Sequence, residues 1–196
     1  MKRQLVMTTA LLCLATAACG RNSGTSEQAP IPSAAPMTSA SGSVEPVPNA
    51  TINEIMRLQS EPAADAIWNS VKTVSNASGV HEFRPRTDAE WAVIDRSARI
   101  LMAVAEFVVQ PARRLVRPGV EMEAGGTLSA EAIQARIAAN RRLFAEKARA
   151  LDGAAREALA AAQARDAERL LAVGGPIDEA CEGCHVEFYY PEPEEK

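Results

Sequence analysis

Residues 166–188 read DAERLLAVGGPIDEACEGCHVEF, and large apolar or sulfur-bearing side chains recur along them every three or four positions. This spacing places the side chains on one face of a helix. Asp166 is a suitable N-cap for that helix, and Gly174-Gly175-Pro176 predicts a kink just before the cysteines. The predicted helix therefore carries both cysteines on its apolar face, whose members are Leu170, Val173, Ile177, Cys181, Cys184 and Phe188.

The two cysteines and the histidine that follows them, Cys181-Glu182-Gly183-Cys184-His185, form a C-x-x-C-H motif. Two cysteines about one helical turn apart can each form a thioether with a haem vinyl group. The next histidine is then placed to ligate the haem iron from one face. This motif is typical of covalent c-type haem attachment. The sequence therefore predicts one covalent haem c, held by Cys181 and Cys184, with His185 as its proximal ligand.

The N-terminus predicts export from the cytoplasm. Lys2 and Arg3 precede an uncharged, mostly apolar run that is too short to span a bilayer, so residues 1–18 are expected to be a signal peptide. Small residues before Cys19 and a glycine after it resemble a bacterial lipobox, in which Cys19 is lipidated and becomes the first mature residue. Ordinary cleavage nearby is the alternative. The expected location is the periplasm, with the protein tethered to a membrane as a lipoprotein.

The cysteine count narrows the roles open to the motif. Cys13 is expected to be lost with the signal peptide and Cys19 to be acylated, so no further thiol is left for a structural disulfide. A zinc site would require four ligands, and His81 is the only other histidine. A thioredoxin-like dithiol remains an alternative, although it requires a strand before the motif and the sequence pattern predicts no strand.

The chain after the signal peptide divides into two parts. Residues 19–50 are rich in Ser, Ala and Pro and are expected to form a disordered tether. Residues 51–196 suffice for one domain. Removing residues 1–18 changes the formal charge from 21 − 25 = −4 to 19 − 25 = −6, which does not favour a nucleic-acid partner.

Apolar residues recur with helical period throughout this domain. A short leading helix begins at Ile52, breaks near Ser60 and continues to about Val74. Residues 76–86 are expected to be a loop that holds His81 in solvent. The capping box Thr87-Asp88-Ala89-Glu90 then begins a helix that Pro111 ends. After a second loop, 118–127, one long helix is predicted from Ser129 to about Ala162.

Four antiparallel helices with short loops predict an all-α, up-down-up-down four-helix bundle. Such a bundle with haem near the end of its last helix resembles the cytochrome c′ family, the class II c-type cytochromes. The resemblance covers about residues 51–190. It is carried by the C-terminal Cys181-Glu182-Gly183-Cys184-His185, the four helical segments and the alanine-rich third helix. It implies a monohaem c-type cytochrome, and homodimers formed through the first two helices are a further implication.

The up-down topology brings the start of the first helix beside the end of the last, so it selects the candidates for the sixth iron position. Met56 lies on the apolar face of the first helix at that end, and a thioether ligand there would give low-spin His/Met ligation. Packing in the core is the alternative role for Met56. Met122, in the second loop, is another candidate ligand, whereas Met102 is mid-helix and expected in the core.

Three arginines follow the second helix at the same end of the bundle. Arg113, Arg114 and Arg117 are expected to include a partner for the haem propionates, because guanidinium pairs well with carboxylate. The alternative is a solvated basic cap that complements the helix dipole.

The expected function is periplasmic electron transfer by a membrane-tethered monohaem cytochrome that exchanges electrons with redox partner proteins. It is not expected to be an enzyme, since the sequence offers no substrate pocket or acid–base pair. One alternative is a five-coordinate haem protein that binds a small gas such as NO or CO. The other is a haem-free helical lipoprotein that uses Cys181 and Cys184 as a dithiol.

Overall fold

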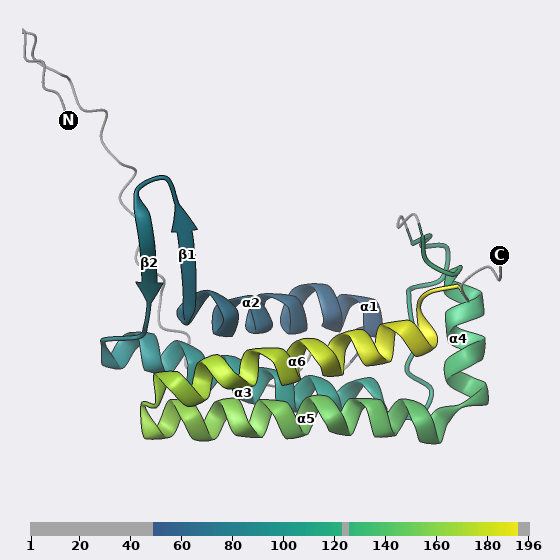
Figure 1. Cartoon of the computed structure of the whole chain (residues 1–196). Coiled ribbons are helices and arrows are strands. Elements are labelled where there is room, and N and C mark those ends of the chain that lie inside the picture. The colour runs from purple at the N-terminus through teal and green to yellow at the C-terminus, as the bar shows by residue number, and fades with distance from the viewer. Residues whose placement is uncertain (1–48, 123–125, 192–196) are drawn as a thin grey trace, which may run out of the picture. The chain divides into compact units, whose positions relative to one another are not determined.

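A computed structural model describes residues 49–122 and 126–191, which are mostly helical and include one small two-stranded sheet (Figure 1). The predicted signal peptide, Cys19 and nearly all of the predicted tether lie outside the described residues. Within them, no helix combines the length and apolar character needed to cross a membrane. The elements in chain order are α1 (Ile52–Ile55), η1 (Met56–Ser60), α2 (Glu61–Ser70), β1 (Lys72–Asn76), β2 (Gly79–Phe83), α3 (Asp88–Val108), α4 (Ala130–Ala139), α5 (Arg141–Ala164) and α6 (Ala167–Phe188).

The first helical stretch begins at a capping box that the sequence analysis did not identify. Thr51 Oγ1 accepts a hydrogen bond from Glu54 N over 3.3 Å, and Thr51 N donates to Glu54 Oε2 over 2.9 Å. The break predicted near Ser60 takes the form of a π-helical turn, η1, in which Glu61 N donates to Met56 O. Pro62 lies in the first turn of α2 and has no N–H to donate to the preceding turn, which accounts for a local departure from α-helical bonding.

The domain is mostly helical, as expected, but it also contains a small sheet. The helix expected to continue to about Val74 ends at Ser70, and the loop expected at residues 76–86 is largely replaced by a hairpin. β1 and β2 form an antiparallel hairpin in which Val74 pairs with His81. Valines and a phenylalanine on either side of Asn76-Ala77-Ser78-Gly79 were the missed signal. The turn uses Gly79 at φ +124° and a hydrogen bond from Ser78 N to Asn76 Oδ1 over 2.9 Å.

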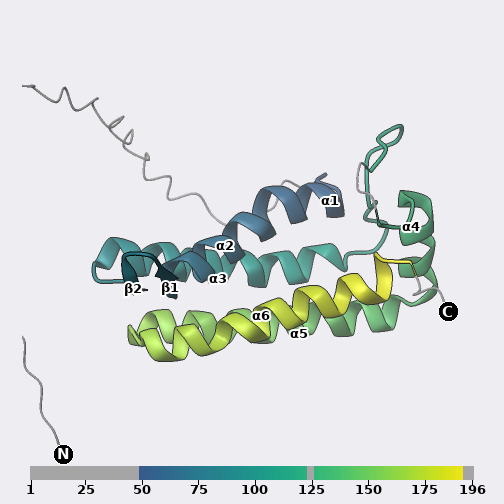
Figure 2. The same ribbon diagram turned by 45° about the horizontal axis from the view of Figure 1, so that its top comes forward.

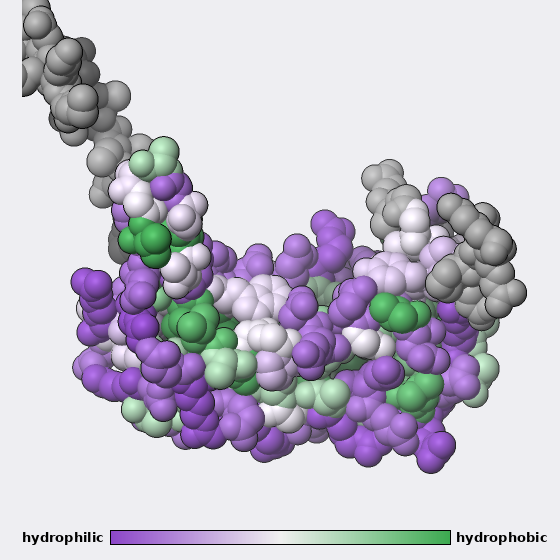
Figure 3. Space-filling view, in the orientation of Figure 1, coloured by the Kyte–Doolittle hydropathy of each residue, from purple (hydrophilic) through white to green (hydrophobic). Residues whose placement is uncertain are grey.

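The hairpin projects from the helices, and every residue of β2 is exposed. Figure 3 shows apolar side chains among polar ones on its surface; Val80 is 68% exposed and Phe83 46%. His81 is therefore solvent-exposed, as expected, but on a strand rather than in a loop. Its Nε2 lies 3.2 Å from Ser78 Oγ.

The helix predicted after Thr87-Asp88-Ala89-Glu90 is confirmed as α3. Thr87 Oγ1 accepts from Glu90 N over 3.2 Å, and Thr87 N donates to Glu90 Oε2 over 2.8 Å. Hydrogen bonds from the backbone N–H groups of Arg86 and Thr87 lower the pKa of Glu90. The apolar face of α3 is largely buried, with Ile94 and Leu101 fully enclosed.

The single helix predicted from Ser129 to Ala162 is two helices, α4 and α5. Asn140 leaves helical geometry with φ −126° and ψ 42°, and its Nδ2 donates to Arg136 O over 3.3 Å. Asparagine side chains compete in this way with the backbone bonds of a helix. The consequence is that α4 lies across the ends of the longer helices (Figures 1 and 2).

The core forms where α2, α3, α5 and α6 pack against one another. α3 packs mainly on α5, α5 on α6, and α2 on both α3 and α6. Small buried residues on α5, such as Ala155 and Ala158, allow the neighbouring helices to approach closely. α6 continues as one helix through Pro176. Trp68 Nε1 donates to Gly174 O over 3.1 Å and so ties α2 to α6.

Candidate functional site

A cavity of about 420 Å³ brings together Met56, Cys181, Cys184 and His185. It lies between the α1–η1–α2 stretch and the C-terminal half of α6, with side chains of α4 and α5 completing the wall. Its volume is in the range of pockets that hold small molecules and cofactors. The structure therefore brings Met56 to the same cavity as a motif that lies more than a hundred positions away in the sequence.

The cavity exists because α2 and α6 touch at one end and diverge toward the other. They meet where Trp68 donates to Gly174 O, and Figure 2 shows α1 standing away from the yellow end of α6. Ala64 and Ala180 are buried small residues on facing sides of the cavity and leave its interior open. The far end is fixed by a hydrogen bond from Leu128 N to Tyr189 O over 2.9 Å.

Met56 and His185 lie at similar distances along their helices from the contact between Trp68 and Gly174. α2 and α6 run in opposite directions (Figures 1 and 2) and are tied at Trp68 and Gly174. From Gly174 to His185 is 185 − 174 = 11 residues, about 16 Å of α-helix. From Trp68 back to Met56 is 68 − 56 = 12 residues, but η1 lies within that stretch, and its i→i+5 bonding accommodates one extra residue. The two stretches are therefore nearly equal in length.

The motif's side chains face the cavity in their neutral forms. Cys181 and Cys184 are free thiols, each partly buried. Burial raises the pKa of Cys181, as do Asp178 and Glu182, and burial raises the pKa of Cys184 to about 11 although nearby Lys147 lowers it. Burial lowers the pKa of His185, which favours neutral imidazole, the form that ligates a metal.

The raised pKa of Cys184 predicts that its thiol reacts slowly with alkylating reagents in protein produced without haem. The thiolate is the reactive form, and 11 − 8 is about 3 pH units, so about one Cys184 in a thousand is ionised at pH 8. Alkylation by iodoacetamide at pH 8 is expected to be on the order of 100-fold slower than for a free thiol of pKa about 8.5. The rate should rise as the pH approaches 11. Labelling at the rate of a free cysteine would contradict this environment.

Much of the remaining wall is apolar and aromatic. Phe144 and Phe188 meet edge to face with ring centroids 5.3 Å apart. The His185 ring lies 5.4 Å from the Tyr189 ring, centroid to centroid. Trp68 closes the end near Gly174. Such a wall suits a flat, largely apolar macrocycle, which would bury its faces against these rings. The residues on the wall therefore fit haem attached through the two thiols.

Arg113, predicted as a propionate partner, does not line the cavity. Its Nε donates to Phe107 O over 2.7 Å, its Nη2 donates to Gln110 Oε1 over 2.6 Å, and its Nη1 donates to Ala50 O. These bonds connect the end of α3 to the start of the described chain. In this structure Arg113 therefore caps the end of α3.

Arg114 and Arg117 do not line the cavity either. Arg117 Nε donates to Glu54 Oε1 over 2.6 Å, and this bond lowers the pKa of Glu54. Arg114 is exposed, and its backbone carbonyl accepts from Ile52 N over 2.9 Å. Both arginines therefore lie beside the α1 segment. Which way the segment after α3 turns could not be read from its sequence.

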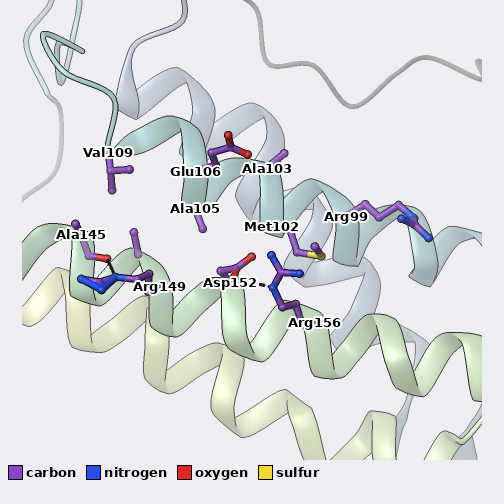
Figure 4. A pocket seen from close by; sticks show the side chains of 11 residues that line it. Arg99, Met102, Ala103, Ala105, Glu106, Val109, Ala145, Arg149, Asp152 and Arg156 are labelled. Atoms are coloured by element: carbon purple, nitrogen blue, oxygen red, sulfur yellow. Dashed lines mark hydrogen bonds and ion pairs between the residues drawn. The ribbon is translucent and has the colours of Figure 1, made fainter.

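Neither of the other two candidate methionines lines the cavity of the motif. Met122 is not part of the cavity wall, and its sulfur lies 4.0 Å from Tyr189 Oη. Met102 lines a different hollow, of about 700 Å³, between α3 and α5 (Figure 4). Of the methionines among the described residues, Met56 alone lines the cavity of the motif.

The hollow between α3 and α5 offers less chemistry despite its greater volume. Figure 4 shows its side chains along the two helices, with Arg156 paired to Asp152 over 2.8 Å. Arg149 Nε donates to Ala145 O of its own helix over 3.1 Å. No cysteine or histidine of the described chain lines this hollow. We interpret it as a groove between two alanine-rich helices.

The cavity wall also includes residues that the sequence analysis missed. Arg57, Glu61 and Lys147 are its charged members, and Trp68 and Tyr190 add aromatic surface. Arg57 directly follows Met56, so the helical pattern that selected the methionine could also have selected the arginine. Lys147 and Trp68 come from distant segments, and only the packing of α5 and α2 on α6 reveals them.

Comparisons with known proteins add no further information on the site. No protein-family model matches the chain, and no curated protein or solved structure gives a significant match. Within residues 49–122 and 126–191, no group of three or more His, Cys, Asp and Glu side chains is arranged to hold a metal ion.

Proposed function

We propose that this protein is a monohaem c-type cytochrome that transfers electrons in the periplasm. The observation that carries the proposal is the cavity whose wall includes Met56, Cys181, Cys184 and His185. An attachment motif located by chance would have no reason to face a cofactor-sized cavity with apolar, aromatic walls. Chance would also not be expected to bring Met56, a candidate iron ligand from a distant helix, to the same cavity as His185.

The arrangement of helices supports the same proposal. α2, α3, α5 and α6 lie side by side (Figures 1 and 2), and their packing on one another supports an antiparallel four-helix bundle. We take the extended first helix of that bundle to be α1, η1 and α2 together. The resemblance to the cytochrome c′ family rests on this arrangement and on the C-terminal motif. The hairpin and α4 are additions to it.

Each residue has a distinct role in the proposal. Cys181 and Cys184 hold the haem through thioethers on successive turns of α6. His185 ligates the iron, and its lowered pKa keeps it neutral for that purpose. Phe144 and Phe188 exclude water from the bound group. The haem supplies one-electron exchange between ferric and ferrous iron, and the chain's contribution is to fix its ligands and surroundings.

Met56 distinguishes an electron carrier from a gas-binding protein. Met56 would hold the iron through its thioether together with His185, and this second protein ligand would favour ferrous iron and exclude CO or NO. The nearly equal helix lengths from the Trp68–Gly174 hydrogen bond support this ligand. Haem-loaded protein is therefore expected to be low spin in both oxidation states and slow to bind CO. Rapid CO binding by high-spin ferrous protein would instead identify a five-coordinate gas-binding protein.

The proposed location follows from the N-terminal sequence. We propose that Cys19 carries a lipid and that residues 19–50 tether the haem domain to the membrane. The domain would then exchange electrons with redox proteins at the membrane surface. A homodimer is a further proposal that rests on the family resemblance.

The dithiol alternative has less support than the cytochrome. Reactive cysteine pairs require a lowered thiol pKa and access to solvent. Here burial raises the pKa of both thiols, and the segment before them is a helix.

A further inference from the structure

The cavity wall carries few charged groups, and each has a definite place. They are Arg57 on η1, Glu61 at the start of α2 and Lys147 on α5. Haem brings two propionates, and a carboxylate at a partly buried site needs a cationic partner. Arg113 and Arg117 already bond to groups outside the cavity. The partner should therefore come from the two cations on the wall itself.

Lys147 lies at the wrong edge for this role. Its Nζ is 3.7 Å from the position that a Cβ on Gly183 would occupy, so the ammonium lies beside the residue between Cys181 and Cys184. The thioethers form at the two vinyl groups, which lie on adjacent pyrrole rings of the macrocycle. The propionates lie on the other two rings, at the opposite edge. A side chain next to Gly183 therefore faces the attachment edge.

Arg57 has the position and the free donors that the role requires. It directly follows Met56 on η1, lines the cavity and is exposed to solvent at its mouth. Within the described part of the chain, its guanidinium forms neither a hydrogen bond nor an ion pair. Glu61, also on the wall, would repel a propionate, which increases the need for a cation there.

We propose that Arg57 is the propionate partner, bound through guanidinium–carboxylate hydrogen bonds. The proposal rests on the proposed function, since it requires attached haem. It gives η1 a second role, because the π-helical turn that presents Met56 to the cavity also presents Arg57 to its mouth. The bond would hold the propionate edge against η1 while the thioethers hold the vinyl edge against α6.

Resonance Raman spectroscopy of haem-loaded protein tests this assignment, because the propionate bending band reports hydrogen bonding to these carboxylates. In Arg57→Gln the band is expected to shift to lower frequency as the charge-assisted bond is lost. Arg57→Lys, which keeps the positive charge, should reverse part of that shift. Arg114→Gln is the matched control, since Arg114 is an exposed arginine off the cavity wall.

Three outcomes would overturn the assignment. One is an unchanged band in Arg57→Gln, and another is an equal shift in Arg114→Gln. In both of these outcomes haem is still attached, so they reject the role of Arg57 and not the proposed function. The third is mature protein without haem, which would reject the proposed function and this role with it. Arg57 is exposed, so far-UV circular dichroism of the variant should match the unsubstituted protein.

Discussion

Replacing both Cys181 and Cys184 by alanine is expected to abolish covalent haem completely. These are the free thiols of the described residues, and both line the cavity that holds His185. Without a thioether, any haem that enters the cavity depends on its axial ligands and on the apolar wall. Acid–acetone extraction of the double variant should then remove all haem, whereas the unsubstituted protein should keep it.

The control for this variant is Val186→Ala, one residue beyond His185. Val186 is 58% exposed and does not line the cavity, so its truncation leaves attachment intact. The single variants Cys181→Ala and Cys184→Ala should each retain haem through one thioether. Haem that resists extraction from the double variant would place the attachment elsewhere and contradict the site.

Replacing Met56 by alanine is expected to change the iron from low spin to high spin. In the proposed ligation the Met56 sulfur lies opposite His185, so its removal opens the sixth position. The long-wavelength absorbance of ferric iron–thioether ligation should disappear, and ferrous protein should bind CO rapidly. The reduction potential should fall by about 0.2 V, within the range over which axial ligands set haem potentials.

Met102→Ala is the matched control for Met56→Ala. Met102 has the same side chain but lines the hollow between α3 and α5 (Figure 4). Its truncation should lower stability modestly and leave the spectrum and the CO reaction unchanged. If Met56→Ala kept the low-spin spectrum, another side chain would have to fill the sixth position. If Met102→Ala lost that spectrum, the role given to Met56 would be wrong.

The motif residues and Met56 were easier to predict from the sequence than the local fold around them. The motif and the apolar stripe on α6 could be recognised from residue spacing alone, because helical spacing does not depend on how neighbouring helices pack. The capping box at Thr87 is likewise local, and it is confirmed. Met56 was selected because antiparallel packing brings the two chain ends together, and the cavity wall includes it.

The mistaken predictions share a different cause. The hairpin at residues 72–83 and the break at Asn140 depend on short segments whose polar residues suit a loop as well as a turn. Arg113 could be placed at one end of the helices, but not relative to the cavity. Its donors bond to carbonyls of Phe107 and Ala50, and the sequence gives no sign of these contacts.

Mass spectrometry of the mature native protein, before and after acid–acetone extraction, tests the central claim most directly. The proposed function predicts one haem per chain, retained after extraction and located by peptide mapping on the segment with Cys181 and Cys184. Protein without haem, or haem that extracts freely, would contradict the proposal that this chain is a c-type cytochrome.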